Sequence, residues 1–473
     1  MGVSKEINFS FHGKLDSSDG DPPEYVATIL YSRWDPTALD VDILWIGGDQ
    51  NRRRGVNTFG HPGKNHIWLR SLDPIQPDVE LLGIDGAKNS YAGTSARSSS
   101  VRVAAVQVGI TQELHSHSRQ LSVIIQLQPS GILSLPTIHE HHYDGHTSVE
   151  PVEEGLIPLR LGKAQLEAGL TYEYGSSEAD GNEITNRVQR ATFMGRLEVE
   201  PTESLFDVHE HLKKALSDAC IALSLCYRQT VDYYQIEYMD NDAQGKRMVH
   251  RRRWNLVKRR ASGDELIHAR ALRKGGLQRL VDGIRGFPRS EELRQAIKFL
   301  AASYTAELET AYFMAFSAME AILACCLEEG EVLALTAGRW KKFEREIRKR
   351  IEELIPLTND SDQEIRDKLC EKVPELKRTT LVRRVSVACE RYKPKTSDLW
   401  VDIPFEEGIE KAARARNGLF HVAGAGVDVM IGLDLIRVRT FTERLLLKLL
   451  SWPDEEVWVW YDQNLKWANQ QPR

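Results

Sequence analysis

The sequence predicts an α+β multidomain protein, with a β-rich module at the N-terminus and an all-α helical bundle toward the C-terminus. The chain has 473 residues, more than one hydrophobic core usually supports, so we expect at least two domains. Short apolar or alternating runs separated by turn residues continue to about residue 200, and helical spacing of apolar residues dominates afterwards. A hydrophobic content of 41% and a charged content of 27% are typical of a folded globular chain.

Four apolar runs are the clearest predicted strands in residues 1–200. They cover 25–30, 41–46, 101–106 and 121–127, and Gly, Pro, Asn and Asp fill the segments between them. Short strands bounded by turn residues favour an antiparallel β protein over an alternating α/β fold. We therefore expect residues 1–200 to form a sandwich-like module or an open barrel.

Residues 201–287 are expected to connect the two modules. Apolar residues recur at helical spacing in 205–225, which predicts one helix. An alternating run at 231–238 leads into a turn at 241–245, and a basic strand follows, which together predict a hairpin.

Residues 288–452 are predicted to be helical almost throughout, and 453–473 to be a C-terminal tail. Ser290 marks the start of the first helix, because Glu291 and Glu292 place acids in its first turn. Further helices are expected at about 333–354, 363–372, 379–392, 405–423 and 431–450.

Several function classes lack support in the sequence. There is no uncharged apolar run of about 18 residues or more and no signal-peptide core, so we expect a cytoplasmic protein without membrane contact. None of the six cysteines forms a C-x-x-C pair, which favours free thiols. Residues 60–65 lack the Ser/Thr and glycine spacing of a P-loop, and 82–87 is not a dinucleotide fingerprint, so no cofactor is expected.

A histidine cluster lies in the β-rich part. Residues two apart on a strand share a face, so these side chains could offer pairs of metal ligands. The segment HEHHYDGH, however, matches neither H-E-x-x-H nor its inverse. An exposed polar loop is the favoured interpretation, and we expect no metal site. The cluster consists of His115, His117, His139, His141, His142 and His146.

The segment 413–421 combines residue types that suit RNA cleavage without a metal. Asn417 and His421 are four residues apart and share a helix face, and the long side chain of Arg416 can reach round to it. His can act as acid or base near neutral pH, Arg can hold a phosphate, and Asn can orient either group. Gly418 removes a side chain beside them at a cost of about 1 kcal/mol in helix propensity. On spacing alone, a solvated Arg and a capping His are the alternative.

The pattern Arg416-Asn417-x-x-x-His421 resembles the R-x(4–6)-H motif of HEPN domains, including the Asn that many members carry after the Arg. The segment 311–323 resembles the long early helix of the Apea-like HEPN family, and 433–450 resembles the helix that closes its bundle. Glu320 resembles a helix acid that is often found in this family. The resemblance covers roughly 290–452, about a third of the chain.

The resemblance implies a metal-independent endoribonuclease of a bacterial phage-defence (abortive infection) or toxin system, leaving 2′,3′-cyclic phosphate ends. It implies catalysis by Arg416, Asn417 and His421, with possible support from Glu320, on RNA such as tRNA or mRNA. It also implies a homodimer in which each HEPN bundle supplies one Arg–His set to a shared cleft. By analogy with such systems, residues 1–200 are expected to be a sensor or specificity module that meets a phage-derived trigger.

Two interpretations from other classes stay open. One is a HEPN bundle that binds RNA or a partner without cutting, next to a ligand-sensing β module. The other is an assembly scaffold in which the helices only dimerise.

A basic stretch at 246–286 stands out in a chain whose net charge is −6, which suggests contact with phosphates. The alternative, with equal weight, is a solvated hairpin and helix paired with acidic surface. The candidate RNA-binding residues are Arg251, Arg252, Arg253, Trp254 and Arg259, with Trp254 available for base stacking. A second basic stretch at 339–350 lies on a predicted helix, and a solvated face is the favoured interpretation there.

Overall fold

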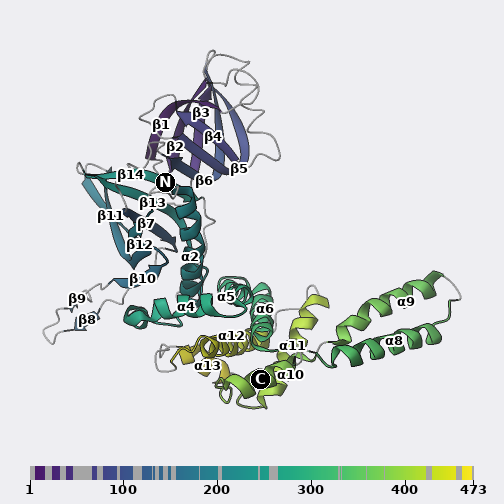
Figure 1. The fold of residues 1–473 in the computed structure, drawn as a ribbon. Coiled ribbons are helices and arrows are strands. Elements are labelled where there is room, and N and C mark those ends of the chain that lie inside the picture. The colour runs from purple at the N-terminus through teal and green to yellow at the C-terminus, as the bar shows by residue number, and fades with distance from the viewer. Residues whose placement is uncertain are drawn as a thin grey trace. The chain divides into compact units, whose positions relative to one another are not determined.

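The computed structural model describes most of the chain (Figure 1). Up to residue 254 it describes 6–15, 24–31, 39–45, 66–71, 78–92, 96–109, 120–129, 132–133, 138–141, 147–150, 156–179, 182–200, 205–242 and 245–254. From 265 to 470 it describes all residues except 329–330, 332, 358–359, 378, 422–428 and 454–460. Within some elements, including most strands before residue 120, only the backbone is described.

The chain divides into two compact units. Unit 1 comprises 1–220, 231–261 and 269–278, and unit 2 comprises 221–230, 262–268 and 279–473. The strands that the structure describes lie in unit 1, and the secondary-structure elements described in unit 2 are helices. The protein is therefore α+β, with a β-rich N-terminal region followed by a helical C-terminal region, as the sequence predicts.

Six strands of unit 1 pair in a closed antiparallel ring (Figure 1). The order is β6-β3-β2-β1-β4-β5, and β5 pairs again with β6. We expected a sandwich or an open barrel, and the structure instead has a closed ring of strands. The ring can close because β5 and β6 are long, at 15 and 14 residues, and each pairs with neighbours on both sides. A bulge between Ile84 and Ala87 in β5 adds the bend that closure needs. The strands are β1 (Glu6–Leu15), β2 (Glu24–Tyr31), β3 (Leu39–Trp45), β4 (His66–Ser71), β5 (Asp78–Ala92) and β6 (Ala96–Gly109).

A second set of six strands continues the same pairing network in the order β10-β11-β12-β7-β13-β14. Alternate residues of β7 are buried, so one face of this sheet is a hydrophobic core, as the run at 121–127 predicts. These strands are β7 (Gln120–Gln128), β10 (Ile157–Leu161), β11 (Ala164–Ala179), β12 (Asn182–Glu198), β13 (Asp232–Asp242) and β14 (Gly245–Trp254). A separate pair is formed by β8 (Ile138–His141) and β9 (Thr147–Glu150).

Helix α2 (Leu205–Cys226) confirms the helix predicted at 205–225. Its part within unit 1 contacts the sheet, since His209 Nδ1 lies 2.8 Å from Tyr238 Oη on β13. Leu212 and Leu216 are buried on the same helix. The amphipathic helix thus covers the apolar face of the second six strands.

The predicted hairpin is confirmed as β13 and β14, with Asp242 opposite Gly245 at its turn. We expected it to connect two modules. In the structure it is an internal part of the sheet, because β13 also pairs with β7 and β14 also pairs with β6. Backbone pairing on both sides fixes the register of the basic strand.

Nearly all of the remaining helices belong to unit 2. They agree within a few residues with the helices predicted from apolar spacing, and α5 begins at Ser290 with Glu291 and Glu292 in its first turn. They are α4 (Leu277–Gly286), α5 (Ser290–Ser303), α6 (Leu308–Cys326), α8 (Ala337–Leu354), α9 (Asp360–Lys372), α10 (Leu381–Tyr392), α11 (Phe405–His421), α12 (Val429–Leu449) and α13 (Tyr461–Gln470). The short elements are α3 (Ala269–Ala271) and the π-helix Leu272–Gly276 in unit 1, and the 3-10 helix Val373–Lys377.

Helix α6 forms the centre of the bundle and packs against α5 and α12. Tyr312, Phe316, Met319 and Ile322 are completely buried on it. Among the described residues, α6 is the one helix with the length and composition of a membrane span, and half of that apolar stretch is buried inside the structure. Such burial is typical of the core helix of a folded domain.

A buried ion pair fastens α12 to the segment 221–230. Arg228 Nε and Nη2 donate to the two carboxylate oxygens of Glu443 at 2.8 and 2.9 Å, and the two side chains are only 6% and 1% exposed. Tyr304 Oη donates to the same carboxylate at 2.5 Å. Burial raises the pKa of Tyr304, so its phenol keeps the proton that it donates.

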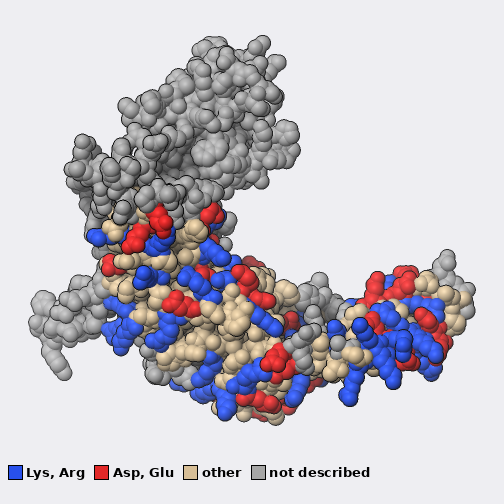
Figure 2. Space-filling model, viewed as in Figure 1, with Lys and Arg blue, Asp and Glu red and all other residues tan. Residues whose placement is uncertain are grey.

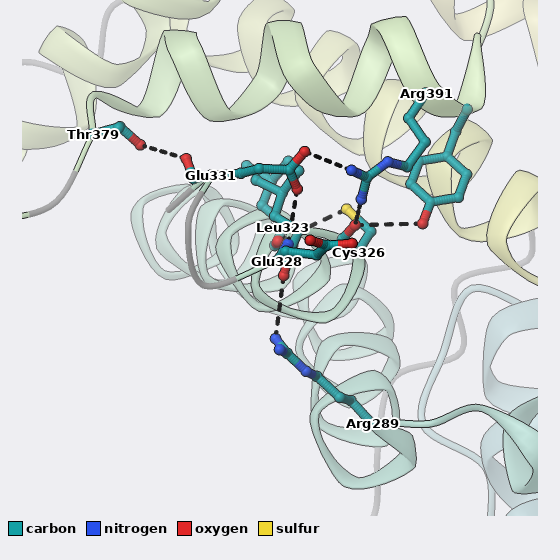
Figure 3. Close-up of polar contacts among 9 residues, drawn as sticks. Arg289, Leu323, Cys326, Glu328, Glu331, Thr379 and Arg391 are labelled. Carbon is teal, nitrogen blue, oxygen red and sulfur yellow. Dashed lines mark hydrogen bonds and ion pairs between the residues drawn. The ribbon is translucent and has the colours of Figure 1, made fainter. Parts of the chain in front are cut away.

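Helices α8 and α9 form a hairpin whose two ends are tied together (Figure 1). Ala334 N donates to Lys377 O at 2.9 Å, and Thr379 Oγ1 donates to Glu331 O at 3.3 Å. Arg391 on α10 donates to the Glu331 carboxylate at 2.5 Å, as Figure 3 shows. The base of the hairpin is therefore held to the bundle by hydrogen bonds.

The same cluster satisfies carbonyls at the C-terminal end of α6 (Figure 3). Arg391 Nη1 donates to Cys326 O at 2.7 Å, and Arg289 donates to Ala324 O and Leu327 O. The last carbonyls of a helix lack partners within it and carry partial negative charge, which cations stabilise. Arg391 of α10 and Arg289, which directly precedes α5, therefore fix the end of α6.

The segment expected as a tail, 453–473, contains helix α13, which packs on α12. Leu465 and Ala468 are buried there. Arg437 Nη2 of α12 donates to Ala468 O at 3.1 Å, and Asn469 Nδ2 donates to Asp398 O at 2.7 Å. The end of the described chain is thus part of the bundle.

Candidate functional site

The candidate site lies where α11 packs against α6. Tyr312 Oη on α6 donates to Ala412 O on α11 at 2.9 Å, and Ile409 and Ala412 are completely buried. Gly408 completes this inner face, because a Cβ there would clash with the indole of Trp400. Small and apolar residues at a spacing of three and four thus bring one face of α11 close to its neighbours and fix the direction of the residues that follow.

Arg416 is one turn further along the inner face of α11 and contacts two residues of α6. Its Nη1 donates to Glu320 Oε1 at 2.7 Å, and its guanidinium carbon lies 5.2 Å from the ring centroid of Phe316. Phe316 and Glu320 are four residues apart, so they share a face of α6. An acid and an aromatic ring together hold the guanidinium in one place.

Asn417 is the third member of this cluster. Arg416 Nε and Nη2 donate to Asn417 Oδ1 at 3.3 and 3.2 Å. The long side chain therefore reaches round to the face of Asn417, which is the geometry expected from the sequence. Arg416 remains 22% exposed and Glu320 39% exposed, so solvent and ions can reach both. The contacts with Glu320 and Asn417 use three of the five N–H donors of the guanidinium, which leaves donors for an anion.

The structure does not show the whole motif. His421 is the last residue of α11, but its side chain lies outside the described residues, as do residues 422–428. Gly418 is exposed on α11, and no described heavy atom lies within 4 Å of a Cβ built there. The structure thus brings together Arg416, Asn417 and Glu320.

The pairing of β14 with β13 shows how the residues of the predicted RNA-binding strand are distributed between the two faces of the sheet. Arg251 and Arg253 lie opposite Glu237 and Gln235, whereas Arg252 lies opposite Ile236. Because strand positions two apart share a face, Arg252 and Trp254 belong to the other face of the sheet. The side chains of these four residues and the whole of Arg259 lie outside what the structure describes. The basic run therefore divides between two faces rather than forming one continuous patch.

The second basic stretch, on α8, agrees with the interpretation as a solvated face. Arg345, Lys349 and Arg350 are exposed, and ion pairs form within the helix. Arg348 pairs with Glu344 at 2.8 Å, and Arg350 pairs with Glu353 at the same distance.

Metal and thiol chemistry find little support in the described part of the chain. No group of three or more described His, Cys, Asp or Glu side chains is arranged to hold a metal ion. His139 and His141 occupy β8, and the other four members of the histidine cluster lie outside the described residues. All six cysteines are free thiols, and burial raises the pKa of Cys325 and Cys326 to about 12, so both stay protonated.

Sequence reasoning missed the part that Phe316 plays. It predicts Phe316 as one residue of an apolar helix face, whereas the structure also places its ring beneath the Arg416 guanidinium. The signal in the sequence is the spacing of Phe316 and Glu320, which puts a ring and an acid one turn apart on the same helix.

The chain was compared with protein-family models, with curated proteins and with solved structures, and none of these matches it.

Proposed function

We propose that the chain is a metal-independent endoribonuclease of the HEPN type, which cleaves RNA to 2′,3′-cyclic phosphate ends. The observation that supports it best is the geometry of Arg416, whose guanidinium is oriented by Glu320, Asn417 and Phe316 and is still accessible. An oriented cation stabilises the charge that builds on a phosphate without reorganising during the reaction. The R-N-x-x-x-H pattern supplies the resemblance to this family.

Each residue of the motif has a role in this mechanism. Arg416 binds the scissile phosphate through its remaining N–H groups, and Asn417 and Glu320 keep the guanidinium in place. His421 removes the proton from the 2′-hydroxyl, and the His421 of a second copy protonates the 5′-oxygen that leaves. One chain offers one motif histidine, so the reaction needs a two-fold dimer with a shared cleft. One proton is taken up and one is given back, and no metal or cofactor takes part.

The wider setting follows from the same family resemblance. We propose a cytoplasmic enzyme of bacterial phage defence or of a toxin system, acting on tRNA or mRNA. Unit 1 would then sense a phage-derived trigger and restrain or release the nuclease.

A second function is favoured by one observation. The Arg416–Glu320 pair also joins α11 to α6 and gives the guanidinium an acidic hydrogen-bond partner, as a purely structural ion pair does. In that case the bundle binds RNA or a partner without cutting it, and unit 1 is a ligand-sensing module.

The deciding experiment is cleavage of total RNA by the purified chain in EDTA. The parent should produce discrete fragments with 2′,3′-cyclic phosphate ends, and Arg416→Ala and His421→Ala should each abolish them. The matched control is Arg414→Ala, because Arg414 lies on the same helix, is 74% exposed and pairs within the helix with Glu410. Equal activity in Arg416→Ala and Arg414→Ala would reject the proposed site, and binding without cleavage by the parent would favour the scaffold.

A mixing experiment tests the shared cleft. A dimer of one parent and one His421→Ala chain has a single motif histidine, so activity should fall with the square of the parent fraction. A linear fall would show that each chain cuts alone. The same variants should relieve any growth arrest that expression of the parent causes.

A further inference from the structure

One aromatic ring of helix α6 is exposed beside the candidate site. The helix carries three aromatic residues, and Tyr312 and Phe316 are completely buried, whereas Phe313 is 43% exposed. The structure describes every residue of α6, and Phe313 is the one exposed large apolar side chain on it. Single apolar residues are common on protein surfaces, so exposure alone assigns no role to this ring. The role follows from its position relative to Arg416.

Helical geometry places Phe313 on the solvent side of the line along which α6 contacts α11. That line passes through Tyr312, Phe316 and Glu320, which are four residues apart and all contact α11. At about 100° per residue, Phe313 lies about 20° from Glu320 around the helix axis. A rise of about 1.5 Å per residue separates the two positions by about 10 Å along the axis. Phe313 therefore shares an exposed stripe with the acid that orients Arg416.

Short side chains occupy the positions between the ring and the oriented guanidinium. Ser317 is one turn after Phe313 and one turn before Glu320 on the same stripe of α6, and it is half-buried. On α11, Ala413 is half-buried one turn before Asn417. At these positions, neither helix places a long side chain between the ring and the Arg416 site.

We propose that an RNA base one or two nucleotides from the phosphate held by Arg416 stacks on Phe313, an inference that rests on the proposed nuclease function. Every base has flat faces that stack on an aromatic ring, whatever its sequence. A cation for the phosphate and a ring about 10 Å away would together fix the register of the strand in the site. Phe313 is then a specificity-determining residue, with a modest preference for the larger faces of purines.

RNA binding by an uncleaving chain tests the contact without relying on activity. The probe is a short unstructured RNA labelled with fluorescein, and the chain carries His421→Ala. Phe313→Leu keeps an apolar side chain but removes the ring, so the affinity should fall about 5- to 100-fold. Phe313→Trp keeps a ring and should bind nearly as the parent ring does. Equal affinity of the Phe313→Leu and parent-ring chains would overturn the proposal.

Phe343 on α8 provides the matched control. It is 40% exposed, and Lys and Arg gather over this helix, as Figure 2 shows. The same change, Phe343→Leu, should leave the affinity unchanged. A general attraction of RNA to exposed rings near cations would instead weaken both Leu variants equally, which would reject a specific stack. Hydrogen exchange on peptides of α6 separates lost stacking from lost packing, and Phe313→Trp decides the case if Phe313→Leu loosens the helix.

Kinetics of the active chain show how the ring contributes. Phe313→Leu should raise KM with kcat nearly unchanged, because a stack that is equally strong before and during the reaction contributes only to binding. Arg416→Ala should instead lower kcat, because its contact strengthens as charge builds on the phosphate. A fall in kcat with unchanged KM in Phe313→Leu would contradict a stacking role.

Abasic RNA identifies the base that stacks. Each RNA of a series lacks one base within two nucleotides of the bond that the parent cuts. At one position, loss of the base should raise KM for the parent, and Phe313→Leu should raise it no further, because both changes remove the same contact. Additive effects at every position would reject the stack.

The stacking contact and the nuclease function can fail separately. If the parent cuts no RNA while Phe313→Leu still weakens binding and Phe313→Trp does not, the nuclease function is rejected and the stack stands. If the parent cuts RNA and Phe313→Leu binds and cuts equally well, the stack is rejected and the nuclease stands. If Phe313→Leu changes dimer formation but not RNA affinity, the ring contacts a second copy instead.

Discussion

The buried contact of Arg228 with Glu443 predicts a large loss of stability when the acid is neutralised. The change Glu443→Gln keeps the volume of the side chain but removes the charge that faces two Arg228 N–H groups and the Tyr304 hydroxyl. Arg228 is only 6% exposed, so its positive charge would stay buried without its carboxylate. Removing one partner of a buried pair costs about 3–5 kcal/mol.

The matched comparison is an exposed pair in the same unit. Arg350 and Glu353 are separated by the same 2.8 Å but are 67% and 46% exposed. Solvent-exposed pairs contribute about 0–1 kcal/mol, so Glu353→Gln should be nearly neutral. The double change Arg228→Met with Glu443→Leu removes both charges and should recover part of the loss, because apolar replacements of a buried pair are often neutral, while the Tyr304 hydroxyl loses its acceptor.

Local stability is the quantity to measure, because a chain of two units need not unfold in one step. Hydrogen exchange followed by mass spectrometry on peptides of α12 reports the opening free energy of this helix. Glu443→Gln should raise exchange there far more than Glu353→Gln does. If the amides of α12 exchange equally fast in Glu443→Gln and Glu353→Gln, the ion pair does not fasten α12. The same conclusion follows if the double change is as unstable as Glu443→Gln.

Further predictions concern other parts of the chain. Gly408→Ala should lower unit 2 stability by about 1–3 kcal/mol through its clash with Trp400, as hydrogen exchange on peptides of α11 would show. Gly418→Ala should instead raise the stability of unit 2 by about 0.5–1 kcal/mol. RNA cleavage by this variant should fall if a second copy approaches α11 at Gly418, and unchanged cleavage would place the dimer contact elsewhere. Burial raises the pKa of Glu265 from 4.5 to about 7, so the folded state binds this proton more tightly than the unfolded state does. The free energy of unfolding should therefore decline as pH rises from 4.5 through 7. Glu265→Gln should make this decline smaller when thermal melts at about pH 5.5 and about pH 8 are compared. Replacing Arg251, Arg252, Arg253 and Arg259 with Ser should make the salt dependence of RNA affinity less steep, by about 0.9 in the log–log slope for each phosphate that the strand no longer neutralises. Changing Arg251 and Arg253 should have an effect independent of changing Arg252, because the register places them on opposite faces of the sheet. An unchanged slope would place the strand away from RNA.

Local patterns in the sequence determine the elements of this protein. The helical spacing of apolar residues at 205–225 predicts α2 almost to the residue, and the alternation at 121–127 predicts the buried face of β7. Ser290 with its following acids predicts the start of α5. These features succeed because capping, helical period and strand period are properties of residues that are neighbours along the chain.

The candidate site shows where such reasoning ends. Arg416, Asn417 and Glu320 can be selected from the sequence by type and spacing, but the contact between Arg416 and Phe316 joins positions about 100 residues apart. A pattern in one segment says little about which distant helix it will meet, because packing depends on the shapes of both surfaces.

The tertiary structure alone decided three features of this chain. It closed six strands into a ring through the pairing of β5 with β6, and it placed the basic strand inside a sheet. It also buried Arg228 against Glu443, which are 215 residues apart. Backbone pairing between strands and buried ion pairs join residues that are far apart in the sequence. They therefore depend on the complete fold, in which every buried polar group needs a partner. The sequence by itself determined the helices, the strands and the chemistry of the motif, because those are fixed within a few turns of the chain.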